Sequence, residues 1–177
     1  MLLERIIVPR LLGIERVASR LPEKVVAQTL IDGYRCKGHL PDPDCDPVEA
    51  AIRLSGLDSN PFGNFLLHGN VVWHMEVWPI DLLRMTRIYP PEHDHFGIHE
   101  VVLGCRKKFG CFAGEIKGCQ TVVDNDAGFK PNPERDKLPI LGIRGRLHNH
   151  IVDGHHRTTL AIWEGKRRMT TITAYPK

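Results

Sequence analysis

The stretch that decides the fold is Leu138–Tyr175, which reads LPILGIRGRLHNHIVDGHHRTTLAIWEGKRRMTTITAY. Its apolar and β-branched runs predict three strands, at 138–143, 147–152 and 168–175. Residues 155–164 fit a helix that ends at Gly165. The order strand, helix, strand predicts a βαβ unit with a right-handed crossover. Its strand-to-helix junction is expected at the carboxyl end of the sheet.

The junction carries basic residues where a helix begins. A helix N-terminus presents unpaired N–H groups and about half a positive charge, so it attracts anions. Gly154 allows close approach, and Arg157 can grip a phosphate with two parallel hydrogen bonds. We therefore predict nucleotide binding by Asp153, Gly154, His155, His156, Arg157 and Thr158. The alternative is that Asp153 only caps the helix and that the histidines are solvated.

This junction and its flanking strands resemble the nucleotide-binding core of the ParB/sulfiredoxin superfamily. The segment Val77–Leu83, VWPIDLL, is similar to the strand and turn that open that core. The family's glycine corresponds to Gly154 and its phosphate-binding arginine to Arg157. His155 stands where sulfiredoxins have a cysteine, and His155-His156 stands where partition proteins have Glu-Arg. Sulfinic acid repair and centromere binding are therefore not expected.

The resemblance implies an α+β fold over residues 68–177, with a ParB/sulfiredoxin-like mixed sheet and packed helices. Residues 1–67 are expected to form a helical N-terminal lobe, and residues 110–137 are expected to form a solvated insertion. The lobe and the domain are expected to pack as one compact unit. Apolar spacing predicts one or two helices over Leu2–Tyr34 with a break at Pro22.

Shorter elements are predicted from local signals. Asp46-Pro47 is typical of a helix start and predicts a helix that continues through Leu54. Gly56–Gly63 is expected to end this lobe. Residues 71–77 predict a buried strand, followed by a short helix after Pro79.

The whole chain is similar to plasmid fertility inhibition factors with oncogenic suppression activity. This similarity implies a cytoplasmic protein, with recruitment to the inner membrane face as an option, that blocks DNA and T-DNA transfer through a type IV secretion system. It also implies ATP hydrolysis and DNA cleavage. The partners implied are the nucleotide, DNA bound without sequence preference, and the secretion coupling protein or the transferred nucleoprotein.

Composition sets limits on these expectations. The 177 residues suit one core, and 24 Lys+Arg against 21 Asp+Glu give a net charge of only +3, so contact with DNA must be local. Five cysteines without a CxxC pair indicate reduced thiols. We expect neither a signal peptide nor a membrane span.

Phosphate hydrolysis needs a cation and a group that orients water. We predict that Glu100 and Asp153 bind Mg²⁺ or another divalent cation, with Glu92 and Asp94 as substitutes for Glu100. The alternative is that Glu100 is an exposed helix glutamate. The predicted catalytic residues are Glu100, Asp153, His156 and Arg157.

Basic clusters predict where DNA binds. They are Arg144 and Arg146 on the strand turn and Lys166, Arg167 and Arg168 after the helix, with Arg106–Lys108 as a further group. Few aromatic residues lie among them, which favours salt-sensitive binding independent of sequence. The alternative is that these residues only make the surface soluble.

Other clusters favour structural roles over metal binding. His148 and His150 share one face of a strand and are expected to flank the pocket. The run Glu92–His95 with His99 is expected to be solvated, and Cys105, Cys111 and Cys119 lack zinc-site spacing. Two further functions stay open: a catalytically idle module that obstructs the coupling protein or its substrate, and a small-molecule kinase acting on an amino acid.

Overall fold

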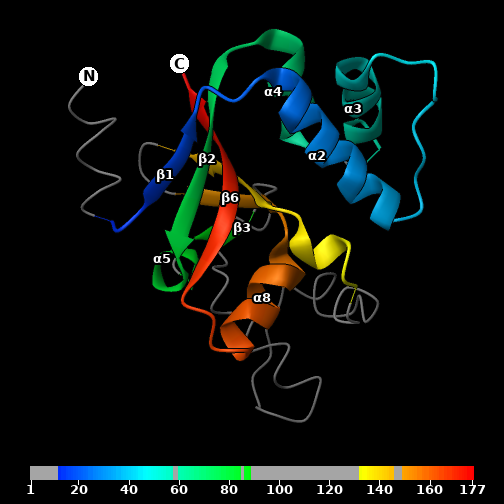
Figure 1. Cartoon of the computed structure of the whole chain (residues 1–177). Coiled ribbons are helices and arrows are strands. Elements are labelled where there is room, and N and C mark those ends of the chain that lie inside the picture. The colour runs from blue at the N-terminus through cyan, green and yellow to red at the C-terminus, as the bar shows by residue number, and fades with distance from the viewer. Residues whose placement is uncertain (1–11, 58–59, 85, 89–131, 146–148) are drawn as a thin grey trace.

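The computed structural model describes residues 12–57, 60–84, 86–88, 132–145 and 149–177, and their centre is a six-stranded mixed sheet in the order β1-β2-β6-β4-β5-β3 (Figure 1). The strands are β1 Glu15–Ser19, β2 Val71–Pro79, β3 Arg87–Ile88, β4 Ile140–Arg144, β5 Asn149–Asp153 and β6 Arg168–Pro176. β4 pairs in parallel with β6, and β3 with β5, while the other pairs are antiparallel. The predicted α+β class with a mixed sheet is confirmed.

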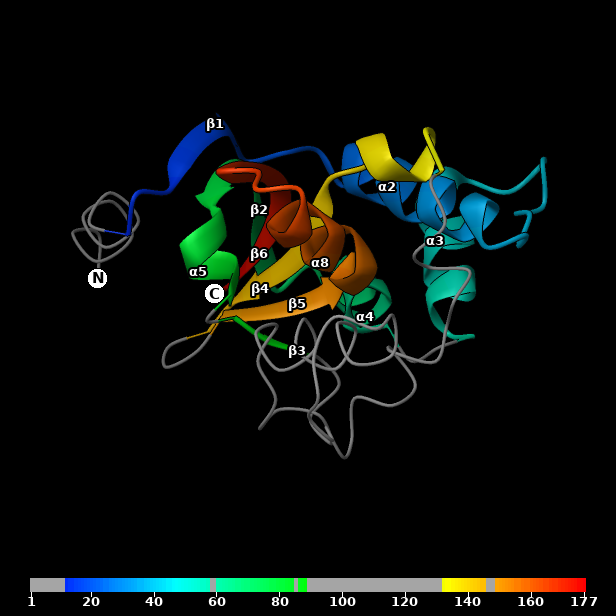
Figure 2. The ribbon, with the colours of Figure 1, turned by 90° about the horizontal axis from the view of Figure 1, so that it is seen from below.

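Helices surround this sheet. They are α2 Glu23–Cys36, α3 Pro47–Ser55, α4 Pro61–His68, α5 Ile80–Arg84, the 3₁₀ helix η3 Arg135–Lys137 and α8 His155–Trp163. The helices α5 and α8 contact each other, and in Figure 2 α8 lies between α5 at one end and α3 at the other. In the ranges given above, no helix is long and apolar enough to cross a membrane.

One hydrophobic core joins α2, α3 and α4 to the sheet. Val26 of α2 and Phe62 of α4 are fully buried in the same cluster as Trp73 of β2 and Ile172 of β6. The rings of Phe62 and Trp73 lie 5.0 Å apart, within the range of favourable aromatic contacts. The helices before residue 68 thus pack directly on the strands that carry the predicted junction.

The first predicted helix is wrong over residues 15–19, which form β1. Apolar residues at spacings of three and four suit a helix, but β1 pairs antiparallel with β2 and has an irregularity between Arg16 and Ala18. Arg16 also forms a 3.0 Å ion pair with the buried Glu76, which an extended edge strand brings within reach. The part of the prediction after Pro22 is confirmed by α2.

The predicted helix at Pro47 is confirmed, but α4 was not predicted. Asn60 caps α4 by accepting a 3.0 Å hydrogen bond from the Phe62 amide. Gly63, which the sequence suggested as the end of the lobe, lies inside α4. A Cβ at this position would lie 2.5 Å from the Cβ of Ser55, so glycine allows α3 and α4 to pack closely.

The predicted βαβ unit is wrong in its strand directions. The strands and α8 occur within two residues of their predicted bounds, but β5 is antiparallel to β4 while β6 is parallel to β4. The parallel crossover therefore runs from β4 to β6 and includes the β4–β5 hairpin and α8. Asp153 pairs with Leu141, so the junction lies at the carboxyl end of β5 but beside the start of β4.

Candidate functional site

The turn between β5 and α8 is built around Gly154. Its φ of +99° belongs to a region that residues with a side chain rarely adopt. A Cβ at this position would lie 3.1 Å from Nη2 of Arg157 and 3.3 Å from the Ile140 side chain. The space over Gly154, which the sequence suggested for an anion, therefore accommodates the Arg157 guanidinium.

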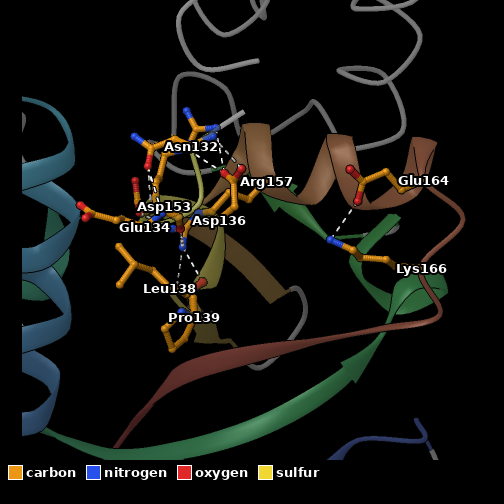
Figure 3. Close-up of polar contacts among 10 residues, drawn as sticks. Asn132, Glu134, Asp136, Leu138, Pro139, Asp153, Arg157, Glu164 and Lys166 are labelled. Atoms are coloured by element: carbon orange, nitrogen blue, oxygen red, sulfur yellow. Dashed lines mark hydrogen bonds and ion pairs between the residues drawn. The ribbon is translucent and has the colours of Figure 1, made fainter. Parts of the chain in front are cut away.

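Arg157 ties the junction to the segment before β4 (Figure 3). Its Nη1 atom donates to the carbonyl oxygens of Leu138 at 2.6 Å, Pro139 at 3.1 Å and Arg135 at 3.4 Å. Its Nη2 atom donates to Oδ2 of Asp153 at 2.7 Å. Because the side chain is only 6 % exposed, these bonds replace most of its hydration.

Asp153 lies between two cations. Besides Arg157, the Nζ atom of Lys37 lies 3.5 Å from its Oδ1, and the Asp153 side chain is a quarter exposed. Burial acts to raise the pKa of Asp153, but the charges of Arg157, Lys37 and His155, with a hydrogen bond from Lys37, together outweigh burial and hold the pKa below its ordinary value. Asp153 is therefore an ionised acceptor at neutral pH.

A narrow cleft with room for about one water molecule lies between α2 and the junction. Thr29, Leu30, Gly33, Tyr34 and Lys37 line it from α2, and Asn60, Leu138, Pro139, Leu141, Asp153 and Arg157 complete it. These residues include two cations and one carboxylate, which gives a net charge of +1. The three charged side chains are joined by ion pairs, and their net positive charge favours an anionic group at the mouth of the cleft.

The other residues of the predicted nucleotide site differ in their accessibility. Thr158 is fully buried, and its hydroxyl donates to the Gly154 carbonyl at 2.9 Å, so that proton stays within the helix. Nε2 of His155 lies 2.9 Å from the Ile151 carbonyl oxygen, so the ring contacts β5. His156 belongs to α8, but its side chain is not among those that the structure describes.

The predicted metal site is only partly within the described residues. Glu100, Glu92, Asp94, the 92–95 cluster with His99, His148 and Cys105, Cys111 and Cys119 lie outside them. In the part that is described, no group of three or more His, Cys, Asp or Glu side chains could hold a metal ion. Asp153 is the one carboxylate among the described cleft residues, and it is already paired with two cations. These residues do not by themselves fit a Mg²⁺ site.

The described members of the predicted DNA-binding set lie toward opposite ends of β6. Arg146 lies outside the description, and Lys166, Arg167 and Arg168 are exposed before and at the start of β6. Arg144 lies at the far end of β4, where its Nη1 donates to Asn149 at 2.7 Å. The register places Arg144 beside Tyr175 of β6. At the usual rise per residue, Tyr175 lies about 23 Å along the strand from Arg168.

Sequence reasoning missed a buried polar cluster around Glu76. This side chain is fully buried, and its Oε1 accepts hydrogen bonds from Arg16 at 3.0 Å and from the Tyr175 hydroxyl at 2.8 Å. Its Oε2 accepts one from Trp78 at 2.9 Å. Burial, together with the charge of Glu76, raises the pKa of Tyr175. The cluster joins β1, β2 and β6, and a glutamate within a largely apolar strand was its sequence signal.

Lys37 was also missed, because no motif marks it and 115 residues separate it from Asp153 in the chain. Only the packing of α2 against the junction brings the two together.

Comparisons of the chain with protein-family models, with curated proteins and with solved structures give no match. The functional proposal therefore rests on the geometry of the cleft and on the sequence motif at residues 153–158.

Proposed function

We propose that this chain binds the phosphates of a nucleotide in the cleft between α2 and the β5–α8 junction, and that it is an ATPase and DNase that inhibits conjugative DNA transfer. The observation that carries the proposal is the convergence of Lys37, Asp153 and Arg157 on one cleft beside the start of α8. Its described lining has a net positive charge, as a site for a polyphosphate requires.

The start of α8 lies next to this cleft, because Asp153 before the turn and Arg157 after it both line the cleft. The first amides of any α-helix have no acceptor within the helix, and the helix dipole adds partial positive charge there. These amides follow Gly154, whose backbone turns the chain from β5 into α8. An anion at the mouth of the cleft would therefore meet backbone donors on one side and side-chain cations on the other.

Asp153 and Arg157 act in this proposal as positioning residues. A carboxylate whose pKa lies below its ordinary value is a weak base at neutral pH, so Asp153 orients cations better than it removes a proton. Arg157 fixes the wall formed by residues 138–139 through its bonds to their carbonyl oxygens. A guanidinium carries five N–H donors, and the contacts described account for Nη1 and one bond of Nη2.

Hydrolysis and DNA cleavage rest on the resemblance of residues 153–158 to the ParB/sulfiredoxin core. A divalent cation would neutralise charge on the transferred phosphoryl group. Its further ligands would have to come from outside the described residues, and Glu100 is the carboxylate that the sequence favours. DNA binding is proposed to be local and independent of sequence, through Arg144 on one side and Lys166–Arg168 on the other.

A catalytically idle binding module is the second candidate. The observation that favours it is that each described bond of Arg157 ends on a protein oxygen, as in a structural anchor. In that case the chain would obstruct the secretion coupling protein or the transferred nucleoprotein without turnover.

One set of experiments separates the two candidates. ATP turnover and DNA cleavage with Mg²⁺ are measured on the purified chain and on Glu100→Gln, with Glu49→Gln on the exposed side of α3 as the matched control. Suppression of conjugation is measured with the same variants in a mating assay. The enzyme proposal expects Glu100→Gln to lose both turnover and suppression. Loss of turnover with intact suppression supports the binding module, and a wild type that does not bind ATP contradicts the proposal.

A further inference from the structure

The wall of the cleft that α2 supplies contains a glycine that packing does not explain. Gly33 lies inside α2, where glycine weakens a helix relative to alanine. Its φ is not positive, so the backbone does not require glycine. Among the described residues, the nearest atom to a Cβ at this position would be Oδ2 of Asp153, at an ordinary contact distance of 4.0 Å. The missing side chain therefore leaves space in the cleft.

Gly33 lies in a row of residues along α2. Thr29, Gly33 and Lys37 are spaced four residues apart, which places them on one side of the helix, and all three line the cleft. Lys37 ends the row. Its ammonium lies 3.5 Å from Oδ1 of Asp153, longer than the roughly 2.7–2.9 Å of a strong charge-assisted hydrogen bond. With 47 % of its side chain exposed, Lys37 has room to change partner.

We infer that Lys37 binds a phosphoryl group of the ligand and that Gly33 keeps the adjoining wall of α2 open to it. This inference rests on the proposed function and deepens it, because it makes a helix from the first 67 residues part of the phosphate site. When the ligand binds, the Lys37 ammonium exchanges the Asp153 oxygen for a phosphate oxygen. Asp153 keeps its 2.7 Å bond to Arg157, so its charge stays compensated.

Charge and size favour the phosphate end of a ligand. The described lining has a net charge of +1, and a lysine ammonium is a compact point charge that suits phosphate. The cleft itself is narrow, with room for about one water molecule, so the phosphoryl group would lie at its open mouth beside the Lys37 ammonium. The phosphate of a nucleotide and that of a DNA strand present the same chemistry here.

The test measures binding of ATP and, separately, of a labelled single-stranded oligonucleotide to the full chain at low salt. The variants are Lys37→Ala, Lys37→Arg, Gly33→Ala and Gly33→Val. Arg35→Ala is the matched control, since Arg35 is an exposed cation on the same helix that pairs with Asp32. Thermal unfolding is recorded for every variant.

We expect Lys37→Ala to weaken binding about tenfold or more, as loss of a hydrogen bond between charged groups does. Arg35→Ala should bind like the wild type within about threefold, a smaller change than the loss of that hydrogen bond causes. Lys37→Arg keeps the charge and should bind more tightly than Lys37→Ala. Gly33→Ala should unfold at a higher temperature because alanine favours the helix, yet bind more weakly, and Gly33→Val should bind more weakly still. If Gly33 had only a structural role, Gly33→Ala would not raise the unfolding temperature and at the same time weaken ligand binding.

The outcomes separate this inference from the proposed function. If the wild type binds ATP and both Lys37→Ala and Gly33→Val bind it equally well, the inference is overturned and the proposed function stands. If the wild type binds the oligonucleotide alone and Lys37→Ala weakens that binding, the inference stands with a DNA phosphate as ligand and the ATPase proposal falls. If the wild type binds neither, both are overturned.

Discussion

Arg157 and Asp153 are four residues apart and joined by a 2.7 Å ion pair, and the same guanidinium donates to the backbone carbonyls of Leu138 and Pro139. The residue that the sequence marks for phosphate binding is therefore also the residue that holds the wall of the cleft in place. Ligand binding and local stability are coupled at this position, so variants of Arg157 must be assessed for both.

Arg157→Ala should destabilise the chain strongly. It leaves three carbonyl oxygens without this donor and the Asp153 carboxylate with Lys37 alone, and breaking a buried ion pair costs about 3 kcal/mol or more. Urea unfolding followed by circular dichroism measures the loss. Arg53→Ala removes an exposed ion pair with Glu49 and should leave the midpoint unchanged. Equal midpoints for wild type and Arg157→Ala would show that the guanidinium is not an anchor.

Gly154→Ala should be more harmful than the same change at another glycine with positive φ. Gly154 and Gly38 have φ of +99° and +87°, so both variants carry backbone strain. A Cβ at 154 meets Arg157 at 3.1 Å, whereas the described residues place nothing within 4 Å of one at 38. The difference in unfolding free energy should be about 1 kcal/mol or more, as for other overpacked sites. Equal losses in the two variants would contradict the placement of Arg157.

The Asp153 ion pairs should make stability depend on pH in the acid range. Its pKa is lower in the folded chain than its ordinary value of 3.8, so the stabilisation is complete above that value and is lost as the pH falls through the folded pKa. Urea unfolding of wild type and Asp153→Asn at pH 6 and pH 3 measures this. The wild type's advantage should shrink at the lower pH, and a constant advantage would refute the ionised pair.

Glu76→Gln should loosen the contact of β1 with the sheet. The carboxylate is fully buried and accepts bonds from Arg16, Trp78 and Tyr175, so losing its charge should cost about 2 kcal/mol. The variant should also lower the raised pKa of Tyr175, which ultraviolet titration of the phenol detects. Stability linked to Tyr175 is present below its ordinary pKa of 10 and is lost as the pH rises beyond it. An unchanged titration would mean that the hydroxyl does not contact Glu76.

Local signals predicted most of the strands and helices, and tertiary contacts explain the exceptions. The signals for α4 were present as Asn60 and Pro61, but Gly63 indicated a break, and only its contact with Ser55 explains a glycine inside the helix. The direction of β6 could not be predicted, because the pattern of Arg168–Pro176 is the same whichever way the strand runs. Pairing with β4 decides it.

The site was predictable only where it is continuous in sequence. The Asp153–Arg157 string indicated a charged junction, but a motif does not show which donors the protein itself uses. Gly33 lies on α2 and Lys37 directly follows it, and although the apolar face of this helix was predicted, nothing local shows that these two residues face Asp153. That relationship arises when α2 packs against the sheet.

The most direct test of the account is a crystal structure of the chain soaked with a non-hydrolysable ATP analogue and Mg²⁺. We expect phosphate density within hydrogen-bonding distance of the Lys37 ammonium and the first amides of α8, with Arg157 still bonded to Leu138 and Pro139. Phosphate density elsewhere on the molecule, with the Lys37–Asp153 ion pair intact at a saturating concentration of the analogue, would contradict it.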